Sequence, residues 1–428
     1  MILTCDIHCH SGYSGGVGKI SFEKLYENLQ IKGINLYGSA DALQPDWRKT
    51  LKESLVESEE GLFVLKNIEE KKYKFIPRVI LESEIVLTAP YFFDKKRRKS
   101  VHLLMTFPAF YVVEKIVKIF EKFGAKLSIG RPYLKFDDLN QMEDFLMNLS
   151  ERFHDIEFIP AHIFTPDGVL GGENPIDCIE QFFGQFGKKI NALESGLSAD
   201  PDMILKIKSL NNFLVISNSD AHSEALNRIG REFFAIEIDN LSYFDIIDSI
   251  RKKRLVYSVE FKPEHVRYFL TGHRADRHDN NQSIYFKVED IPENLICPIC
   301  HKRMIEGVEY RVQKLFLKDK DLINKKADLN LFRKQKFFYS IPLIEVVAIS
   351  LNSSIKSKKV NDIYRLIIDE VGFESNLYMM DEKKIIDIIN NLKIEDKVKS
   401  SLAAIRKNLF KFEPAGFDGN YGQLKILN

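Results

Sequence analysis

The sequence predicts an α/β fold in residues 1–260, followed by a small polar module and a mostly helical, basic C-terminal region. In the first part, short apolar runs alternate with amphipathic stretches whose apolar residues recur every three or four positions. Strands that alternate with helices pair in parallel, so we expect an α/β sheet or barrel. Around residue 261 the alternation stops, and beyond about residue 310 helical periodicity dominates.

Seven apolar runs of strand length define the expected sheet, and two helical patterns lie between them. The predicted strands are, in order, 2–7, 34–39, 78–83, 101–107, 156–161, 191–195 and 213–217, and the clearest helices between them are 22–31 and 109–123. Residues 261–310 are rich in His, Asn and turn residues, which indicates a loop-rich module. Further helices are expected at 343–351, 361–371 and 383–392, before turn residues and a short strand at the end. We therefore predict domains at 1–260, 261–310 and 311–428.

Length and composition exclude several classes of protein. A chain of 428 residues fits two to three domains, and no apolar run approaches the ~18 residues of a membrane span. The start, MILTCDIHCH, lacks the basic region and the long apolar stretch of a signal peptide. Five cysteines in a chain of this length do not make a disulfide framework. We expect a protein of the reducing cytoplasm with no membrane partner.

Charge divides along the chain. Residues 1–300 hold 38 Lys and Arg against 44 Asp and Glu, a net charge of −6, and residues 301–428 hold 24 against 17, a net charge of +7. An acidic body with a basic appendage is typical of a metal-binding or catalytic domain joined to an anion-binding one. Ordinary solvation of a charged surface explains the same numbers equally well.

Histidines and carboxylates gather where the predicted strands end. In a parallel α/β barrel the carboxyl ends of the strands meet on one face, so side chains far apart in sequence can share one pocket. Any one of these histidines, taken alone, is better explained as an ordinary buried or surface residue. Coincidence is a poor explanation for all of them together. The residues at strand ends are His8, His10, His102, His162, His222, Asp41, Glu84, Glu194 and Asp220.

The spacing His8-Cys9-His10 places both imidazoles on one side of a strand and the thiol on the other. Asp220 and His222 repeat this spacing, and imidazole with carboxylate suits zinc, manganese or iron. A carboxylate such as Glu84 can bridge two ions, and a two-metal site activates water for displacement at phosphorus.

These residues stand in motifs that resemble a known family. HCHSGYS, GSADAL, LESE, HLLM, PAH and SDAH are similar to the successive motifs of the polymerase and histidinol phosphatase (PHP) superfamily of metal-dependent phosphoesterases. GRP, PAHIFTP, LESGLSADPDM, SNSDAHS, RIGREF, SIPLIEVV and FEPAGFDGNYGQLKI further resemble the endonuclease Q family of that superfamily, over nearly the whole chain. The resemblance implies a distorted (β/α)7 barrel, followed by a zinc-knuckle-like module and a helical domain.

The superfamily pattern implies two divalent ions, zinc, manganese or magnesium, with a third as an alternative. Ala42 stands where many members have a histidine, which weakens the case for the third. Asp41 and His222 would border the site or hold that further ion. The implied ligands are His8, His10, Glu84 and Asp220 for one ion, and Glu84, His102 and His162 for the other.

The family's activity implies further roles. We expect cleavage of DNA on the 5′ side of a deaminated base (uracil, hypoxanthine or xanthine) or an abasic site, with Asp220 or His222 handling the proton and Asp41 beside them. Arg131 and Arg231 are expected to hold phosphate, although a structural ion pair explains either as well. A Gly-containing loop after a strand can bring backbone donors close to a base. The expected substrate contacts are Ser195, Gly196, Leu197, Ser198, Ala199, Asp200, and Arg97 and Arg98 in the basic run 94–100, which is either a DNA-gripping loop or a charged hairpin tip.

The middle module contains half of a recognisable zinc site. Cys297 and Cys300 form a C-x2-C knuckle, and the second cysteine pair expected of endonuclease Q relatives is replaced by His273 and His278. His301 is an alternative to either histidine. We expect a structural zinc that supports contact with duplex or single-stranded DNA, against the alternative of a knuckle that folds without metal.

The leading hypothesis is thus a metal-dependent DNA endonuclease of the repair type. One alternative is a PHP phosphatase or exonuclease acting on small phosphate esters or another nucleic acid. The 170-residue basic extension argues against it. The other alternative is a DNA-binding subunit with a vestigial metal site, and the complete set of ligands argues against that.

Overall fold

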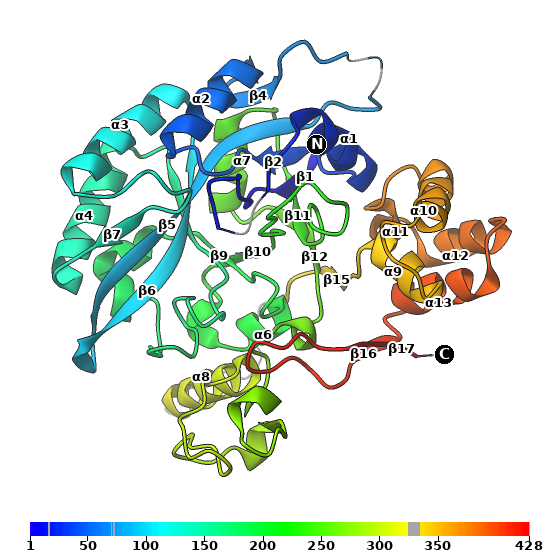
Figure 1. The fold of residues 1–428 in the computed structure, drawn as a ribbon. Helices are drawn as coiled ribbons and strands as arrows, with labels where there is room; N and C mark the ends of the chain where they lie inside the picture. Colours follow the sequence, from blue (N-terminus) through cyan, green and yellow to red (C-terminus); the bar gives the residue numbers. More distant parts are fainter. Residues whose placement is uncertain (16–17, 70, 72, 324–333, 428) are drawn as a thin grey trace.

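A computed structural model describes residues 1–15, 18–69, 71, 73–323 and 334–427, and Figure 1 shows its fold. A twisted sheet forms the body, helices α1 to α4 cover its outer side, and two further groups of elements lie beside and below it. In the described residues the main sheet has 11 strands, in the order β15-β12-β11-β1-β2-β5-β4-β3, with β6 and β7 also paired to β5 and β8 paired to β6.

Every expected strand is present in this structure. The strands of the main sheet are β1 Ile2–Asp6, β2 Leu36–Gly38, β3 Leu55–Glu59, β4 Leu62–Leu65, β5 Arg78–Tyr91, β6 Asp94–Phe107, β7 Tyr133–Lys135, β8 Glu157–Pro160, β11 Phe233–Glu237, β12 Leu255–Glu260 and β15 Phe337–Tyr339. A separate parallel pair consists of β9 Ala192–Glu194 and β10 Leu214–Ile216. The mixed α/β class and the helical C-terminal region are confirmed.

Strand direction departs from the expectation of uniformly parallel pairing. β1, β2 and β5 pair in parallel, but β5 and β6 form a long antiparallel hairpin, and β6 pairs antiparallel with β8. Only two residues join β5 to β6, and parallel neighbours need a crossover of a dozen or more residues. The basic run 94–100 is therefore the start of β6, next to the hairpin turn, rather than a loop.

Backbone hydrogen bonds link the strands that carry the predicted site residues. The Ile163 amide donates to Glu194, which connects the end of β8 to β9, and the His10 amide donates to Ala221, which connects the end of β1 to the end of β10. These strand ends therefore surround a common centre, as the barrel prediction requires. The distorted (β/α)7 barrel itself remains a prediction.

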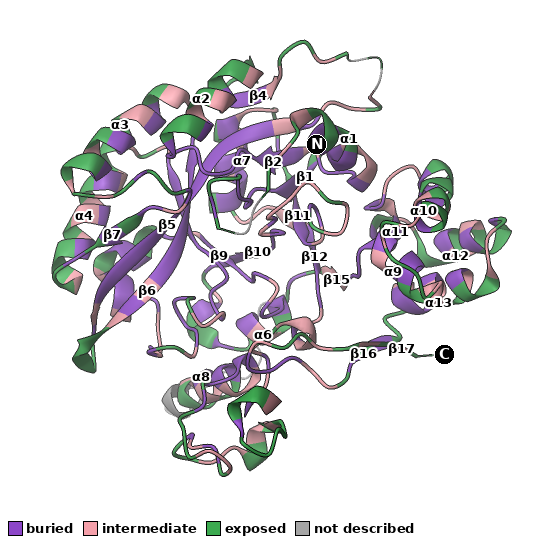
Figure 2. Ribbon diagram, viewed as in Figure 1, coloured by how far each residue is buried: buried purple, intermediate pink, exposed green. Residues whose placement is uncertain are grey.

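Helices pack on the outside of the sheet through amphipathic faces. α1 shows why its bounds lie where they do: the Ser21 hydroxyl accepts a hydrogen bond from the Lys24 amide at its start, and Gly33 adopts the left-handed conformation at its end. The helices of this part are α1 Phe22–Lys32, α2 Pro45–Ser54, α3 Phe110–Lys122, α4 Leu139–Arg152, α5 Glu180–Phe183, α6 Pro201–Leu205 and α7 Tyr243–Arg251. Figure 2 shows buried strands beneath helices that expose one side.

The remainder of the chain forms a small module and a helical unit. The module contains the hairpin of β13 Thr271–His273 and β14 Ile284–Phe286, followed by α8 Val308–Ile323. The helical unit consists of α9 Leu343–Ser350, α10 Lys358–Val371, α11 Asn376–Met379, α12 Glu382–Asn391 and α13 Asp396–Arg406. β15 precedes this unit but pairs with β12, so residues 337–339 extend the main sheet.

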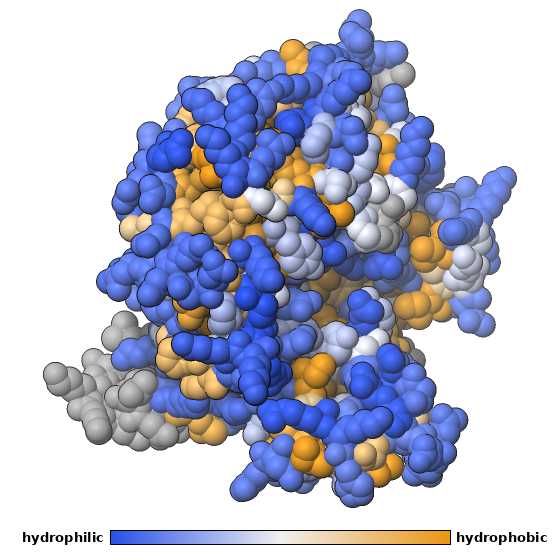
Figure 3. Space-filling model, turned by 60° about the vertical axis from the view of Figure 1, so that its left-hand side comes forward, coloured by the Kyte–Doolittle hydropathy of each residue, from blue (hydrophilic) through white to orange (hydrophobic). Residues whose placement is uncertain are grey.

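The chain ends in a hairpin of β16 Phe410–Phe412 and β17 Leu424–Ile426, whose long connection runs back along the lower side of the body (Figure 1). The face in Figure 3 is mostly hydrophilic, with hydrophobic side chains gathered only in small patches. No helix in the described part of the chain combines the length and the apolar character that crossing a bilayer demands.

Candidate metal centre

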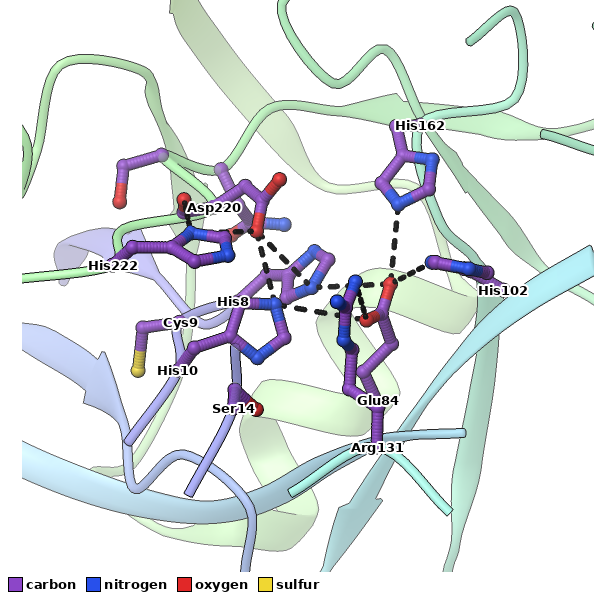
Figure 4. A network of polar contacts seen from close by, with 12 residues as sticks. His8, Cys9, His10, Ser14, Glu84, His102, Arg131, His162, Asp220 and His222 are labelled. Carbon is purple, nitrogen blue, oxygen red and sulfur yellow. Dashed lines mark hydrogen bonds and ion pairs between the residues drawn. The ribbon is translucent and has the colours of Figure 1, made fainter. Parts of the chain in front are cut away.

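The HxH segment follows β1 and begins the site. His8 and His10 are both buried, and the intervening Cys9 turns the other way, where its thiol contacts the Gly38 carbonyl at 3.1 Å. Figure 4 shows the two imidazoles on the same side of the chain, facing Asp220 and Glu84. The alternation of a strand thus produces the chelating pair that the sequence predicts.

Asp220 joins these histidines to make the first group of ligands. Its Oδ1 lies 3.0 Å from the Nε2 of His10 and 3.9 Å from the Nε2 of His8. Candidate ligand atoms of the three side chains lie within 4.8 Å of one another. Asp220 has a φ of +46°, an uncommon conformation for a residue with a side chain, and this backbone turns its carboxylate into the site.

Glu84 on β5 is the centre of a second group. Its Oε1 lies 2.8 Å from the Nδ1 of His102 and 3.1 Å from the Nε2 of His162. The same carboxylate faces the first group, with Oε1 3.6 Å from the Nε2 of His8 and Oε2 3.6 Å from the Nε2 of His10. Figure 4 shows Glu84 between the two sets of imidazoles, the position a bridging ligand occupies.

Four buried atoms at this centre have no hydrogen-bond partner among the described residues. They are the Nε2 atoms of His8 and His10, Oε2 of Glu84 and Oδ1 of Asp220. Buried polar atoms without a partner are rare because each costs about 1–3 kcal/mol. Divalent cations would satisfy all four, so the residues present fit the metals that the family pattern implies.

Carboxylates behind the histidines orient them. Glu194 accepts from the Nδ1 of His8 at 2.9 Å and from the His162 amide at 2.8 Å. Asp41 lies 3.4 Å from the Nδ1 of His10, and the Ser11 and Ser14 hydroxyls both donate to it. Such partners fix the ring orientation and leave the Nε2 lone pairs facing the centre. The structure thus places Asp41 behind His10, at the border of the site, and a catalytic role for it remains a prediction.

The buried carboxylates attract positive charge strongly. Burial alone would raise the pKa of Asp220, but its close contact with His10 and the charge on His8 hold that pKa well below its usual range. Burial likewise opposes a charged His10, yet Asp220 and Asp41 raise its pKa to about 10. A pocket that stabilises cations to this extent, on imidazoles or on metal ions, is suited to bind divalent cations.

The remaining predicted residues of the centre lie at its rim. His222 is half-buried, its Nδ1 lies 2.9 Å from the Asp220 carbonyl, and its ring centroid is 4.6 Å from that of His10. Arg131 reaches the centre itself, with Nη1 3.5 Å from the Oε2 of Glu84. Arg231 donates from Nε to the Ser219 carbonyl at 2.9 Å, next to the ligand Asp220. Phosphate binding by either arginine remains a prediction.

The loop after β9 contains the predicted base contacts, and most of its side chains already have partners. Ser195 bonds to Ser217 and Glu260, and Ser198 donates to the Ser195 carbonyl. Asp200 caps α6 and accepts from Tyr339. Ala199 is buried, while Leu197 is half-buried and donates its amide to Glu232. A base pocket here would thus be formed by loop backbone and the Leu197 side chain, and that role remains a prediction.

Gly196 occupies a position that no other residue fits. Its φ is +60°, and a Cβ built on it would lie 2.2 Å from the Cβ of His162. We predict that Gly196→Ala displaces His162 and lowers phosphodiesterase activity by at least about tenfold, because it disturbs a metal ligand through its backbone. Gly124→Ala is the matched control, since Gly124 has a φ of +88° but nothing within 4 Å. Equal activity of the two variants would contradict the prediction.

The predicted arginines of the basic run support the β5–β6 hairpin. Arg98 donates from Nη2 to the carbonyls of Thr88 and Phe136, both at 2.7 Å. Arg97 lies over the Tyr91 ring, with Cζ 5.9 Å from its centroid. A DNA contact for either residue remains a prediction.

A second, separate cluster lies in the middle module. His278 Nε2 lies 3.2 Å from the Cys297 sulfur, and His273 Nδ1 lies 3.3 Å from the Cys300 sulfur. Candidate ligand atoms of the four side chains all lie within 4.8 Å of one another. His301 is exposed and is not part of this group. The structure brings together two histidines and two cysteines, a tetrahedral set that suits zinc.

Sequence reasoning found the ligands but not the residues behind them. Glu194 was recognisable as a carboxylate at a strand end, yet no role followed from that position alone. Ser11, Ser14 and Thr165 also hold ligands or their partners, Thr165 through a 2.7 Å contact between its hydroxyl and the Nδ1 of His162. In the sequence, these residues stand out only because each lies close to a predicted ligand. Single polar residues in ordinary turns can lie equally close, so this feature does not identify them.

Comparison with known proteins identifies similar molecules. No protein-family model matches the chain. It is 29% identical over 253 residues to the uncharacterized protein MJ0043 of Methanocaldococcus jannaschii, covering 58% of this chain and 30% of that protein. It is 27% identical over 293 residues to the uncharacterized protein YqxK of Bacillus subtilis, covering 63% of this chain and 68% of that protein. The match thus spans under a third of the archaeal relative's length.

Two solved structures match from end to end. The lesion-specific endonuclease Q of Pyrococcus furiosus has a TM-score of 0.78 and 27% identity, covering 100% of this chain and 96% of that one. Endonuclease Q in complex with a 27-mer duplex that has an abasic lesion at the active site also has a TM-score of 0.78, with 28% identity and coverage of 100% and 97%. The match over the whole chain and the two groups of candidate ligands are those of a metal-dependent hydrolase that acts on DNA. Within that class the chain is a relative of endonuclease Q over its whole length, and the resemblance expected from its motifs is confirmed.

Proposed function

We propose that the protein is a metal-dependent DNA endonuclease that hydrolyses the phosphodiester on the 5′ side of a deaminated base or an abasic site. The observation that carries the proposal is the pair of ligand groups joined at Glu84, within a chain that matches endonuclease Q along its full length. None of the five cysteines forms a disulfide in the described part of the chain, which suits a reducing, cytoplasmic compartment.

The candidate ligands at the centre fall into two sets, one for each ion. His8, His10 and Asp220 would hold one divalent ion and His102 and His162 a second, with Glu84 between them. Such ions supply water activation and charge neutralisation at the phosphoryl group. Two ions of zinc, manganese or magnesium account for these ligands. Because Asp41 lies behind His10, a third ion would have no carboxylate of its own.

Arginine and imidazole groups at the rim would complete the reaction site. Arg131 is one-third exposed and faces Glu84, so its guanidinium can hold a non-bridging phosphate oxygen as negative charge develops. His222 has its Nδ1 next to the Asp220 carbonyl, which leaves Nε2 to exchange a proton with water or the leaving oxygen.

A nicking assay tests this function. Labelled duplexes with one uracil, hypoxanthine or abasic site, and an undamaged control, are incubated with the protein in manganese, magnesium or zinc, with Asp220→Ala alongside. We expect one nick 5′ to the lesion that is absent with the variant. Uniform cutting, or hydrolysis of bis(p-nitrophenyl) phosphate without any nicking, would leave a metal phosphoesterase and reject the repair activity. Binding without hydrolysis of either substrate would favour a vestigial site.

The cysteine and histidine cluster has its own test. We predict that the purified protein holds one zinc ion that Cys297→Ser/Cys300→Ser loses and Asp220→Ala retains, measured by mass spectrometry of the native protein. Because zinc binding stabilises a module with little core of its own, residues 271–306 should become cleavable by protease in the double variant. Unchanged zinc content and protease resistance would show that the knuckle folds without metal.

A further inference from the structure

The loop between β16 and β17 is fastened to the body of the protein by close backbone contacts. The Gly416 amide donates to the Glu264 carbonyl at 2.8 Å, and the Gly422 amide donates to the His265 carbonyl at 2.9 Å. A Cβ at Gly416 would lie 1.9 Å from the Val266 carbonyl oxygen. The loop is therefore held against residues 264–270 at a distance that only glycine permits, so its position is defined.

This loop presents one aromatic side chain to solvent. Tyr421 is 54% exposed, and its ring centroid lies 5.2 Å from that of His265. The Cζ of Arg267 lies 5.2 Å from the same centroid. His265 is itself held between Phe261 and Phe412, at centroid distances of 4.9 and 5.0 Å. The tyrosine thus has a rigid base and an arginine beside it, yet more than half of it faces solvent.

Arg267 lies beside this tyrosine, and Arg231 bonds at 2.9 Å to the carbonyl of Ser219, the residue before the ligand Asp220. Burial lowers the pKa of Arg231, whereas the negative charges of Asp220 and Tyr421 act to raise it. Burial and the positive charges of Arg231 and Arg228 lower the pKa of His265 to about 4, so that imidazole is neutral at pH 7. In the part of the chain that the structure describes, no carboxylate lies within 4.0 Å of Arg228, Arg231 or Arg267. None of these three guanidinium groups is therefore in an ion pair with a described residue.

We propose that Tyr421 and Arg267 form a DNA subsite on the body that carries the metal centre. The Tyr421 side chain packs against a nucleotide of the bound strand, and the Arg267 guanidinium binds a flanking phosphate. Aromatic rings tolerate any base and arginines any phosphate, so the subsite recognises a nucleic-acid strand and not a sequence. This proposal rests on the proposed function, because that function makes DNA the substrate. It also gives a reason why the loop between β16 and β17 returns to the catalytic body.

The tyrosine is tested by binding and by cleavage. In an Asp220→Ala background, Tyr421→Ala should weaken binding of an abasic duplex about 5- to 100-fold by fluorescence anisotropy, whereas Tyr421→Phe, which keeps the ring, should bind like the parent. Tyr111→Ala is the matched control, because Tyr111 is 61% exposed with Lys115 Nζ 5.1 Å from its ring centroid, but lies on α3. Hydrolysis of bis(p-nitrophenyl) phosphate by Tyr421→Ala with Asp220 intact should match that of the wild type.

The arginine is tested by salt dependence. Each phosphate contact contributes about 0.9 to the slope of log affinity against log salt concentration on duplex DNA. Arg267→Gln should therefore reduce that slope by about one, and Arg152→Gln, on the outer helix α4, should leave it unchanged. An unchanged slope in Arg267→Gln would overturn the phosphate contact.

Failure of the subsite can be told from failure of the proposed function. If the wild-type protein does not nick lesion duplexes, the repair activity is rejected, but the affinity and salt slope for undamaged single-stranded DNA still test the subsite. Equal affinity of Tyr421→Ala, Tyr111→Ala and the parent for both kinds of DNA would overturn the proposal. A loss of ester hydrolysis in Tyr421→Ala, equal to its loss of DNA cleavage, would also overturn it, since damage to the metal centre would then explain both.

Discussion

Glu84→Gln is expected to abolish cleavage and to reduce the metal content of the protein. The Glu84 carboxylate is fully buried, contacts His102 and His162 through Oε1, and faces His10 through Oε2. An amide has nearly the same shape but cannot supply the negative charge that two cations share. Changing a residue behind a metal ligand typically costs 10- to 100-fold in affinity or activity, so losing the shared ligand should cost more than about 100-fold.

Glu82→Gln is the matched control for this prediction. Glu82 lies two residues earlier on the same strand face and is equally buried, but burial raises its pKa to about 8. Its carboxyl is thus largely neutral at pH 7, and it accepts a hydrogen bond from the Ala40 amide that a glutamine carbonyl can also accept. We expect this variant to keep most activity and metal, measured by nicking rate and mass spectrometry. Equal losses in the two variants would mean that Glu84 supports the fold and not the metals.

The ligands could be predicted from sequence because strand geometry controls them. His8 and His10 share a face through the two-residue period of a strand, and Asp220 and His162 follow strands whose ends meet at one centre. These rules need only the position of each residue relative to a strand end. The positions of Asp41 and Glu194 behind the imidazoles depend on side-chain directions in the folded protein, so a strand-end position could not distinguish a ligand from the residue that orients one.

Strand direction could not be predicted because apolar periodicity is the same in parallel and antiparallel strands. Residues 78–83 and 101–107 matched the expectation of two separate strands, yet the polar and basic residues between them continue both into one hairpin. The connection lacks a helix, which is the signal that argues for antiparallel pairing. Similarly, Phe337 and Phe338 follow a basic segment but pair with β12, where both side chains are half-buried.

The helical unit meets α1 through contacts that sequence alone does not reveal. The Glu374 and Ser375 amides donate to the carbonyls of Ile31 and Lys32 at the end of α1. Gly33 ends that helix with a φ of +77°, and a Cβ there would lie 2.2 Å from the Ser375 hydroxyl oxygen. The close approach brings Lys32 and Glu374 together, 342 residues apart in sequence.

Breaking this buried ion pair should produce the largest loss of stability in the chain. Lys32 Nζ lies 2.6 Å from the Glu374 carboxylate, and their side chains are 1% and 4% exposed. Tyr364 and the Leu343 amide also donate to Glu374, so the carboxylate has more partners than the ammonium. Glu374→Leu leaves Lys32 buried without a countercharge, and we expect it to lower the free energy of unfolding by about 3–5 kcal/mol in urea titrations.

A double variant separates the contribution of the ion pair to the free energy of unfolding from the cost of leaving one charge buried without its partner. Lys32→Met/Glu374→Leu removes both charges, so it should recover part of the stability that Glu374→Leu loses, because no ion remains buried. The exposed pair Lys49–Glu53, 77% and 67% exposed, is the control, and Lys49→Met should change stability by less than about 0.5 kcal/mol. A double variant no more stable than Glu374→Leu would show that apolar side chains cannot replace the carboxylate's bonds to Tyr364 and Leu343. The junction between α1 and the helical unit would then depend on that hydrogen-bond network more than on charge.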